Sequence, residues 1–141
     1  MIMVDTSVLI GFLKGSSSQK VKLFQEVLLR KIPYGISALT LQEVLQGART
    51  EADFKTLEEY LSTQHIYYLG RSPQFYTKAA EMYCQLRWKG VTPRSSIDLL
   101  IALTAIENNL VLLHDDRELD FLAENIHGLK ILDASVNDLG L

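Results

Sequence analysis

Short apolar runs alternate with longer amphipathic segments along the whole chain of 141 residues. The apolar runs are typical of buried strands, which we expect at residues 2–4, 34–37, 66–69, 110–113 and 130–132. Between them, apolar residues recur at helical spacing. This spacing predicts helices at residues 6–13, 19–30 and 51–62, around Leu41 up to Gly47, from about 75 to 90, and at 97–107 and 117–125. Such alternation predicts an α/β fold in which helices cover both faces of a central parallel sheet.

The composition fits a compact enzyme. An apolar fraction of 48% with 22% charged residues is ordinary for a globular protein, and we expect one domain spanning residues 1–141. No run reaches the ~18 apolar residues of a membrane span, and no signal-peptide pattern opens the chain. The single cysteine, Cys84, cannot form an internal disulfide. We therefore expect a cytoplasmic protein that binds no membrane.

The net charge of −3 argues against a protein that coats nucleic acid by bulk attraction. It does not exclude a nuclease, because the carboxylates that hold a metal contribute to that charge.

Four acidic residues stand where an apolar run meets a helix: Asp5, Glu43, Asp98 and Asp116. In a parallel sheet these points converge on the edge formed by the carboxyl ends of the strands, where ligands bind. Four carboxylates in one pocket would repel one another unless a hard divalent cation shared them. Mg²⁺ or Mn²⁺ would also activate water and stabilise charge on a phosphate. We therefore expect a metal-dependent enzyme that acts on phosphates.

Each acid also has a purely structural interpretation as a helix cap. Asp5 and Asp116 precede helices, and Thr40–Glu43 and Ser95–Asp98 have the spacing of a capping box. Capping alone does not explain why an unbroken apolar run follows Asp98, or why a wholly apolar strand leads into Asp5. An uncompensated buried carboxylate is destabilising by several kcal/mol. A bound cation would compensate it.

The segments at residues 3–10, 36–47, 90–102 and 112–117 carry these acids or flank them, and their order and spacing match a known family. They resemble the PIN-domain ribonucleases, and more narrowly the VapC-type toxins of bacterial toxin–antitoxin pairs. The resemblance implies a three-layer α/β/α fold and an Mg²⁺- or Mn²⁺-dependent endoribonuclease that inhibits translation and growth. It also implies a homodimer, and a small antitoxin that blocks the active site.

By the same resemblance, Asp5, Glu43, Asp98 and Asp116 form the catalytic quartet. Because Mg²⁺ usually takes only one or two protein carboxylates directly, we expect Asp5 and Asp98 to be its nearest ligands and Asp116 a further or water-mediated one. Glu43 is expected to orient or deprotonate the attacking water. Asp115 remains an alternative to Asp116, which the family spacing favours.

Polar and basic side chains should surround the acids and bind RNA. Thr6 and Ser7 correspond to the small hydroxyl residues that the family carries beside its first acid. Arg94 and Arg117 are the favoured phosphate contacts, ahead of Lys14, Arg87 and Lys89. Unpaired bases could stack on Tyr67, Tyr68 or Trp88, although aromatic residues at such positions more often pack against the protein. His114 is expected to be half-exposed at a strand end.

Two other functions stay open from the sequence. One is a PIN-domain nuclease of RNA processing. The other is a non-catalytic α/β module that binds a partner protein and uses its acids only as caps. A phosphatase with an aspartyl nucleophile fits less well, because Ser7 stands where such enzymes commonly carry a second acid. The sequence does not identify which RNA would be cut.

Overall fold

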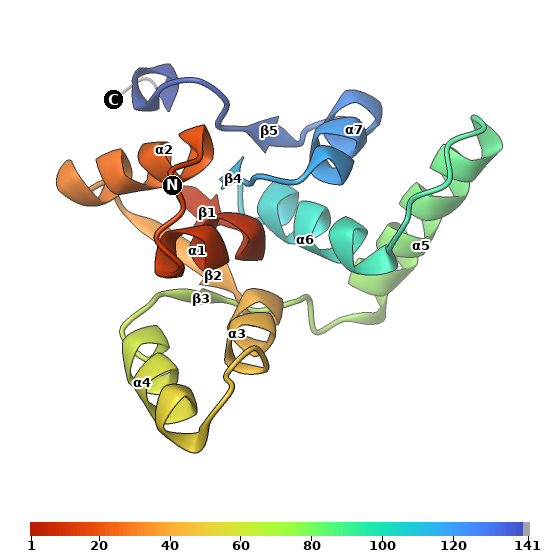
Figure 1. The fold of residues 1–141 in the computed structure, drawn as a ribbon. Helices are drawn as coiled ribbons and strands as arrows, with labels where there is room; N and C mark the ends of the chain where they lie inside the picture. Colours follow the sequence, from red (N-terminus) through yellow and green to blue (C-terminus); the bar gives the residue numbers. More distant parts are fainter. Residues whose placement is uncertain (140–141) are drawn as a thin grey trace.

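A parallel sheet forms the centre of the computed structural model, which describes residues 1–139 (Figure 1). Its strands are β1 (Ile2–Val4), β2 (Tyr34–Ser37), β3 (Ile66–Tyr67), β4 (Val111–Leu113) and β5 (Lys130–Ile131). They lie in the order β3-β2-β1-β4-β5, and every neighbouring pair is parallel. The predicted parallel sheet is confirmed. Strand β3 is shorter than predicted, because its pairing with β2 ends at Ser37 and Tyr67.

Helices cover both faces of this sheet. One face carries α1 (Thr6–Leu13), α2 (Gln19–Leu29), α3 (Ala38–Leu45) and α4 (Glu51–Leu61), and the other carries α5 (Pro73–Trp88), α6 (Ser96–Glu107) and α7 (Arg117–Asn125). A 3₁₀ turn (Val136–Leu139) contacts α2. Strand side chains alternate between the two layers: Ile2 and Val4 pack with the first group, and Met3 with the second. This is the expected three-layer α/β/α fold.

The chain adds strands in opposite directions on the two sides of the β1–β4 pair: β2 and β3 lie beyond β1, and β5 lies beyond β4. Two helices lead from β1 to β2 on one side, whereas α7 leads from β4 to β5 on the other. Right-handed crossovers in opposite directions place α1 and α7 on opposite faces, so the carboxyl ends of β1 and β4 form a topological switch point. Ligands of α/β sheets bind at such points. Asp5 and Asp116 follow these two strands.

Two helix starts test the capping interpretation. Ser37, not Thr40, caps α3, because its Oγ accepts from the Thr40 N–H at 3.1 Å. Ser95 caps α6 as predicted, with its Oγ accepting from the Ile97 N–H at 3.1 Å. No hydrogen bond within residues 1–139 joins Asp98 back to Ser95. The proposed capping-box role of Glu43 and Asp98 is therefore wrong.

Helix α6 is buried over most of its length, as its apolar sequence predicts. Within the described part of the chain, no helix combines the length and the apolar character that a membrane crossing needs.

Candidate active site

Asp5 lies at the carboxyl end of β1, beside the end of β4. Val4 pairs with Leu113, and the Asp5 N–H donates to the Leu113 carbonyl at 2.8 Å. The Asp5 carboxylate caps α1, because its Oδ2 accepts from the Ser7 N–H at 3.1 Å and from the Ser7 hydroxyl at 2.6 Å. The residue is only 5% exposed. Its Oδ1 accepts no hydrogen bond within residues 1–139, so one oxygen remains for another ligand.

The Ser7 hydroxyl joins the segments of the first and fourth acids. Besides donating to Asp5, its Oγ accepts from the Asp115 N–H at 2.9 Å. Asp115 therefore meets this cluster through its backbone, and the residue is exposed. The contact fixes the turn after β4 against the start of α1.

Thr6 ties Glu43 to the other side of Asp5. The Thr6 hydroxyl donates to Glu43 Oε1 at 2.9 Å and lies 3.0 Å from the Thr40 hydroxyl. Glu43 comes from α3, so this contact bridges α1 and α3 across the sheet edge. Glu43 is not among the charges that act on Asp98. Glu43 thus lies at the margin of the acidic group.

Asp98, in the first turn of α6, is half-buried and has the most perturbed carboxyl group of the site. Burial is the largest cause that raises its pKa from 3.8 to about 6; the negative charges of Asp116, Asp5 and Glu118 contribute to the rise, and Arg94 opposes it. Coulomb energies fall with distance, so these acids share one neighbourhood. Asp116, and not the alternative Asp115, belongs to that group.

Asp116 begins α7 and carries the site's cationic contact. Its Oδ1 accepts from the Glu118 N–H at 3.0 Å, as expected of a helix cap. The Arg94 guanidinium lies 3.5 Å from the same oxygen, with the side chain 71% exposed. The Arg94 N–H donates to Glu118 Oε1 at 2.9 Å, which ties the loop before α6 to α7. Arg117 is exposed and pairs with no acid within residues 1–139. Only one of the two favoured arginines therefore lies at the acids.

His114 is fully buried, at 1% exposure, so the expectation of a half-exposed histidine is wrong. It lies next to Asp5 across the β1–β4 pair, and its Nδ1 accepts from the Asp116 N–H at 3.0 Å. Burial lowers its pKa from 6.5, and Asp120 opposes that effect. Its position after a fully apolar strand is the sequence signal that could have indicated burial.

The donor set fits a hard divalent cation. Asp5, Asp98 and Asp116 offer carboxylate oxygens, and the pKa of Asp98 is raised first by burial and then by the negative charges of Asp116, Asp5 and Glu118, which Arg94 only opposes in part. As the side chains stand in residues 1–139, no three acidic, histidine or cysteine groups converge closely enough to form a ready metal cage. Mg²⁺ tolerates this arrangement, because it usually keeps several of its waters.

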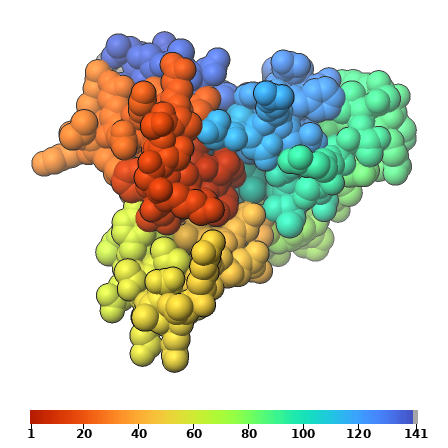
Figure 2. Space-filling model, viewed as in Figure 1, coloured from red at the N-terminus to blue at the C-terminus, as the bar shows by residue number. Residues whose placement is uncertain are grey.

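The four acid-bearing segments meet on one face of the molecule. In Figure 2, α1 (red), α3 (gold), α6 (teal) and the start of α7 (blue) adjoin one another on the side toward the viewer. Residues from both ends of the chain thus build one surface.

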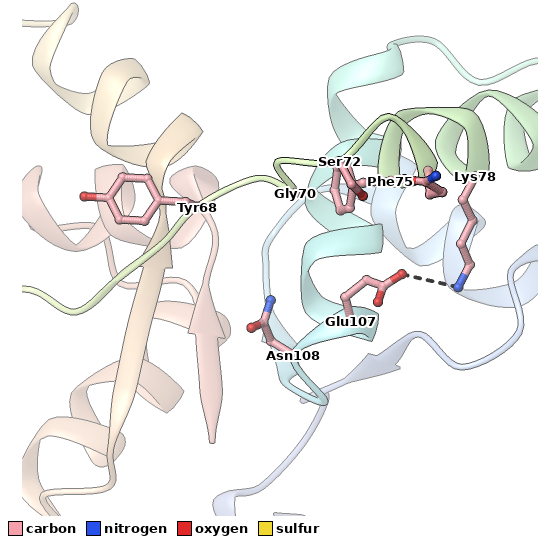
Figure 3. Close-up of a pocket in the computed structure, with 8 residues that line it drawn as sticks. Tyr68, Gly70, Ser72, Phe75, Lys78, Glu107 and Asn108 are labelled. Atoms are coloured by element: carbon pink, nitrogen blue, oxygen red, sulfur yellow. Dashed lines mark hydrogen bonds and ion pairs between the residues drawn. The ribbon is translucent and has the colours of Figure 1, made fainter.

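A hollow of about 440 Å³ lies elsewhere, between the start of α5 and the end of α6 (Figure 3). Lys78 and Glu107 point toward each other there, with Nζ and Oε1 3.3 Å apart. None of the four acids lines it. Its paired charges leave no unbalanced group, so the acids at the topological switch point are the better candidate site.

Known proteins share the fold described above. The PIN domain family model matches residues 2–125. A chain of the DNA-bound VapBC2 complex of Rickettsia felis is 27% identical with a TM-score of 0.69, over 94% of this chain and 98% of that one. A chain of the DNA-bound VapBC complex of Salmonella typhimurium is 26% identical with a TM-score of 0.71, over 94% and 98%.

The VapBC-1 structure from nontypeable Haemophilus influenzae shares the fold. Its chain is 23% identical with a TM-score of 0.69, over 94% of this chain and 98% of that one. No curated protein sequence gives a match. The family model nevertheless spans the sheet from β1 to β4 and all seven helices of the described residues. The chain therefore belongs to the PIN domain family.

Proposed function

We propose that this chain is an Mg²⁺- or Mn²⁺-dependent endoribonuclease, the toxin of a toxin–antitoxin pair that inhibits translation and growth by cutting RNA. The observation that carries the proposal is the group of acids at the topological switch point, where burial, and after it the charges of Asp116, Asp5 and Glu118, raises the pKa of Asp98 to about 6. A nuclease fold supplies the reaction class, and the unbalanced negative charge supplies the need for a cation.

Asp5, Asp98 and Asp116 are the residues that would hold the cation, with Asp5 and Asp98 nearest. When bound, the cation supplies an activated water and stabilises the charge on the phosphate. Capping uses Oδ2 of Asp5 and Oδ1 of Asp116, so each of these carboxylates keeps one oxygen for this role.

Glu43 would orient or deprotonate the attacking water. Thr6 holds its Oε1, which leaves Oε2 without a hydrogen-bond partner in residues 1–139. The hydroxyls of Thr6 and Ser7 hold these acids in place, and their predicted contact with RNA stays a prediction.

Exposed cations and aromatic rings are available to bind RNA. Arg94 is exposed beside Asp116 and can turn from that carboxylate to a phosphate. Arg117 is exposed at the first position of α7. Trp88 and Tyr68 are 73% and 67% exposed, so the expectation that such rings pack against the protein is wrong for both. Trp88 lies between Arg87 and Lys89, which suits stacking on an unpaired base.

A small antitoxin would restrain the nuclease. Two solved structures above 25% identity are of VapBC complexes. An arginine of the partner can form a bidentate contact with Asp5, Asp98 or Asp116 in place of the cation. We also propose a homodimer that acts in the cytoplasm, where its RNA substrate lies.

Apolar residues of α1 and α2 are poor anchors for this partner, because Leu9 and Phe24 are core residues, 1% and 0% exposed, and Phe12 is partly buried. A hollow of about 670 Å³ between α1, α3 and α4 offers apolar surface instead, and Leu13, 40% exposed, lines it.

The test uses protein purified away from its antitoxin and freed of metal. We expect it to cleave RNA when Mg²⁺ or Mn²⁺ is added and to stop with EDTA, and we expect Asp98→Asn to be folded but inactive. Sequencing the cut ends of cellular RNA after brief expression would then identify the target. Cleavage that survives thorough chelation would contradict the mechanism.

A further inference from the structure

The imidazole of His114 is buried beside the acidic group, and neither capping nor metal binding uses it. It follows β4 directly, at 1% exposure, and faces three acids: Asp5, Asp116 and Asp120. Buried polar groups in proteins nearly always have hydrogen-bond partners. The partners of its two ring nitrogens therefore indicate what the side chain does.

Nδ1 accepts the backbone N–H of Asp116 at 3.0 Å. An imidazole nitrogen that accepts a hydrogen bond carries no proton, so the ring is the neutral tautomer with its proton on Nε2. The Asp116 carboxylate is held separately, because its Oδ1 accepts the Glu118 N–H at 3.0 Å. The Arg94 guanidinium also lies 3.5 Å from that Oδ1, from an exposed side chain, whereas the contact to the Asp116 backbone N–H comes from the buried His114 ring.

Nε2 lies 3.1 Å from Oδ1 of Asp120. Its N–H does not point at that oxygen well enough to form a hydrogen bond, and Nε2 has no other partner in residues 1–139. Asp120 lies one helical turn after Asp116 on α7, so the two acids share a face of that helix. Its side chain is 59% exposed, which lets it rotate to meet the ring.

We propose that His114 is a positioning residue: through Nδ1 it holds the Asp116 peptide so that the Asp116 carboxylate faces Asp98, and Asp120 orients the ring. This inference rests on the proposed function, since it assigns a purpose to Asp116 as a cation ligand. It adds two residues, His114 and Asp120, that do not touch the cation or the RNA. Partners of metal ligands commonly change metal affinity by about 10- to 100-fold.

Two substitutions of His114 separate the acceptor from the bulk of the ring. In His114→Asn, the amide oxygen occupies about the place of Nδ1 and still accepts the Asp116 N–H. In His114→Phe, a ring of similar shape fills the buried space without an acceptor. Calorimetric titration of Mn²⁺ into each metal-free protein measures the effect. We expect affinity to fall about 10- to 100-fold in the Phe variant, and most of it to return in the Asn variant.

Substitution of Asp120 tests the second contact on an exposed side chain, where folding is not at risk. Asp120→Ala should weaken Mn²⁺ binding in the same direction, by less than His114→Phe. Glu124→Ala is the matched control, because it removes the same charge one turn further along α7, from an exposed position. The control should bind Mn²⁺ as the wild type does.

The outcomes separate this inference from the proposed function. Wild-type affinity in a folded Phe variant, or equal losses in the Asn and Phe variants, overturns the positioning role while leaving the metal site intact. If the Phe variant does not fold, equal affinities of Asp120→Ala and Glu124→Ala overturn it instead. Wild-type protein that binds no Mn²⁺, or Asp98→Asn protein that binds it fully, overturns the proposed function and this inference together.

Discussion

Replacing Asp98 by asparagine should stabilise the metal-free protein, and the gain should depend on pH. The carboxyl pKa rises from 3.8 to about 6 on folding, so the folded state holds a proton that the unfolded state has released between these values. Wild-type stability therefore falls as the pH rises through that window. The difference between 3.8 and about 6 corresponds to at most about 3 kcal/mol. Because the side chain is only half-buried, solvent screening reduces this to about 1–2 kcal/mol.

Urea unfolding in EDTA measures the effect. At about pH 8 the Asn variant should gain about 1–2 kcal/mol, or about 3–8 °C in Tm, whereas near pH 4 the gain should nearly vanish because the wild-type side chain is then largely neutral. Saturating Mg²⁺ should reverse the order, since it stabilises only a protein that binds it.

Asp53→Asn is the matched control for this experiment. Asp53 occupies the same third position of α4 that Asp98 occupies in α6, but it is exposed. The substitution therefore reports the loss of a charge near a helix start without the acidic neighbours. An Asp98→Asn variant that is no more stable at about pH 8 than near pH 4, relative to wild type, would refute the reasoning.

Three further substitutions test neighbouring contacts. Ser7→Ala removes the hydroxyl that joins Asp5 to the turn after β4. It should lower the free energy of unfolding by about 1–2 kcal/mol in a urea titration. Unchanged stability would mean that other contacts hold the turn. Trp88→Ala should change stability by less than about 0.5 kcal/mol, because the ring is 73% exposed. It should nevertheless weaken single-stranded RNA binding to the inactive Asp98→Asn background by about 1–3 kcal/mol, measured by fluorescence anisotropy. Arg94→Gln should weaken RNA binding a few-fold. It should also strengthen Mn²⁺ binding a few-fold, because the Arg94 guanidinium lies 3.5 Å from Asp116 and competes with a cation there. A change of the two affinities in the same direction would contradict this expectation.

Most elements could be predicted because the periodicity of apolar residues reports burial directly. Helices 6–13 and 117–125 and strands 2–4 and 34–37 match the structure, and several other ends differ by one residue. The clearest error is the strand predicted at 66–69, which ends at Tyr67. Tyr68 and Leu69 have strand-like side chains, but β2 offers no pairing partner beyond Ser37. Strand ends are set by the neighbouring strand, and a single segment of sequence does not contain that information.

Helix capping and cation binding, the two interpretations of the acids, do not exclude each other. Asp5 and Asp116 do cap helices, yet each uses a single oxygen for the cap, and the charges of both act on Asp98. Glu43 and Asp98 make no such cap. Capping signals depend on spacing along the chain, whereas the convergence of the acids depends on strand order. Which carboxylates act on a substrate stays a prediction.

His114 and Asp120 show what sequence spacing could not indicate. Their contact joins β4 to α7, and its geometry depends on how deeply the turn between them packs. The apolar run before His114 predicts a buried neighbourhood, but no pattern along the chain predicts which ring nitrogen accepts a hydrogen bond.

The central position of β1 has a consequence for the chain while it is being made. Strand β1 needs β4 as its neighbour, and Asp5 needs Asp116, yet 111 residues of synthesis separate these two acids, from position 5 to position 116. At ribosomal speed that interval lasts on the order of 10 seconds. During it, the nascent chain carries its first acid without the last, so it cannot bring the two together. On the proposed function, a ribosome that makes this protein would be shielded from the product until late in translation, and a partner translated nearby would have time to be ready.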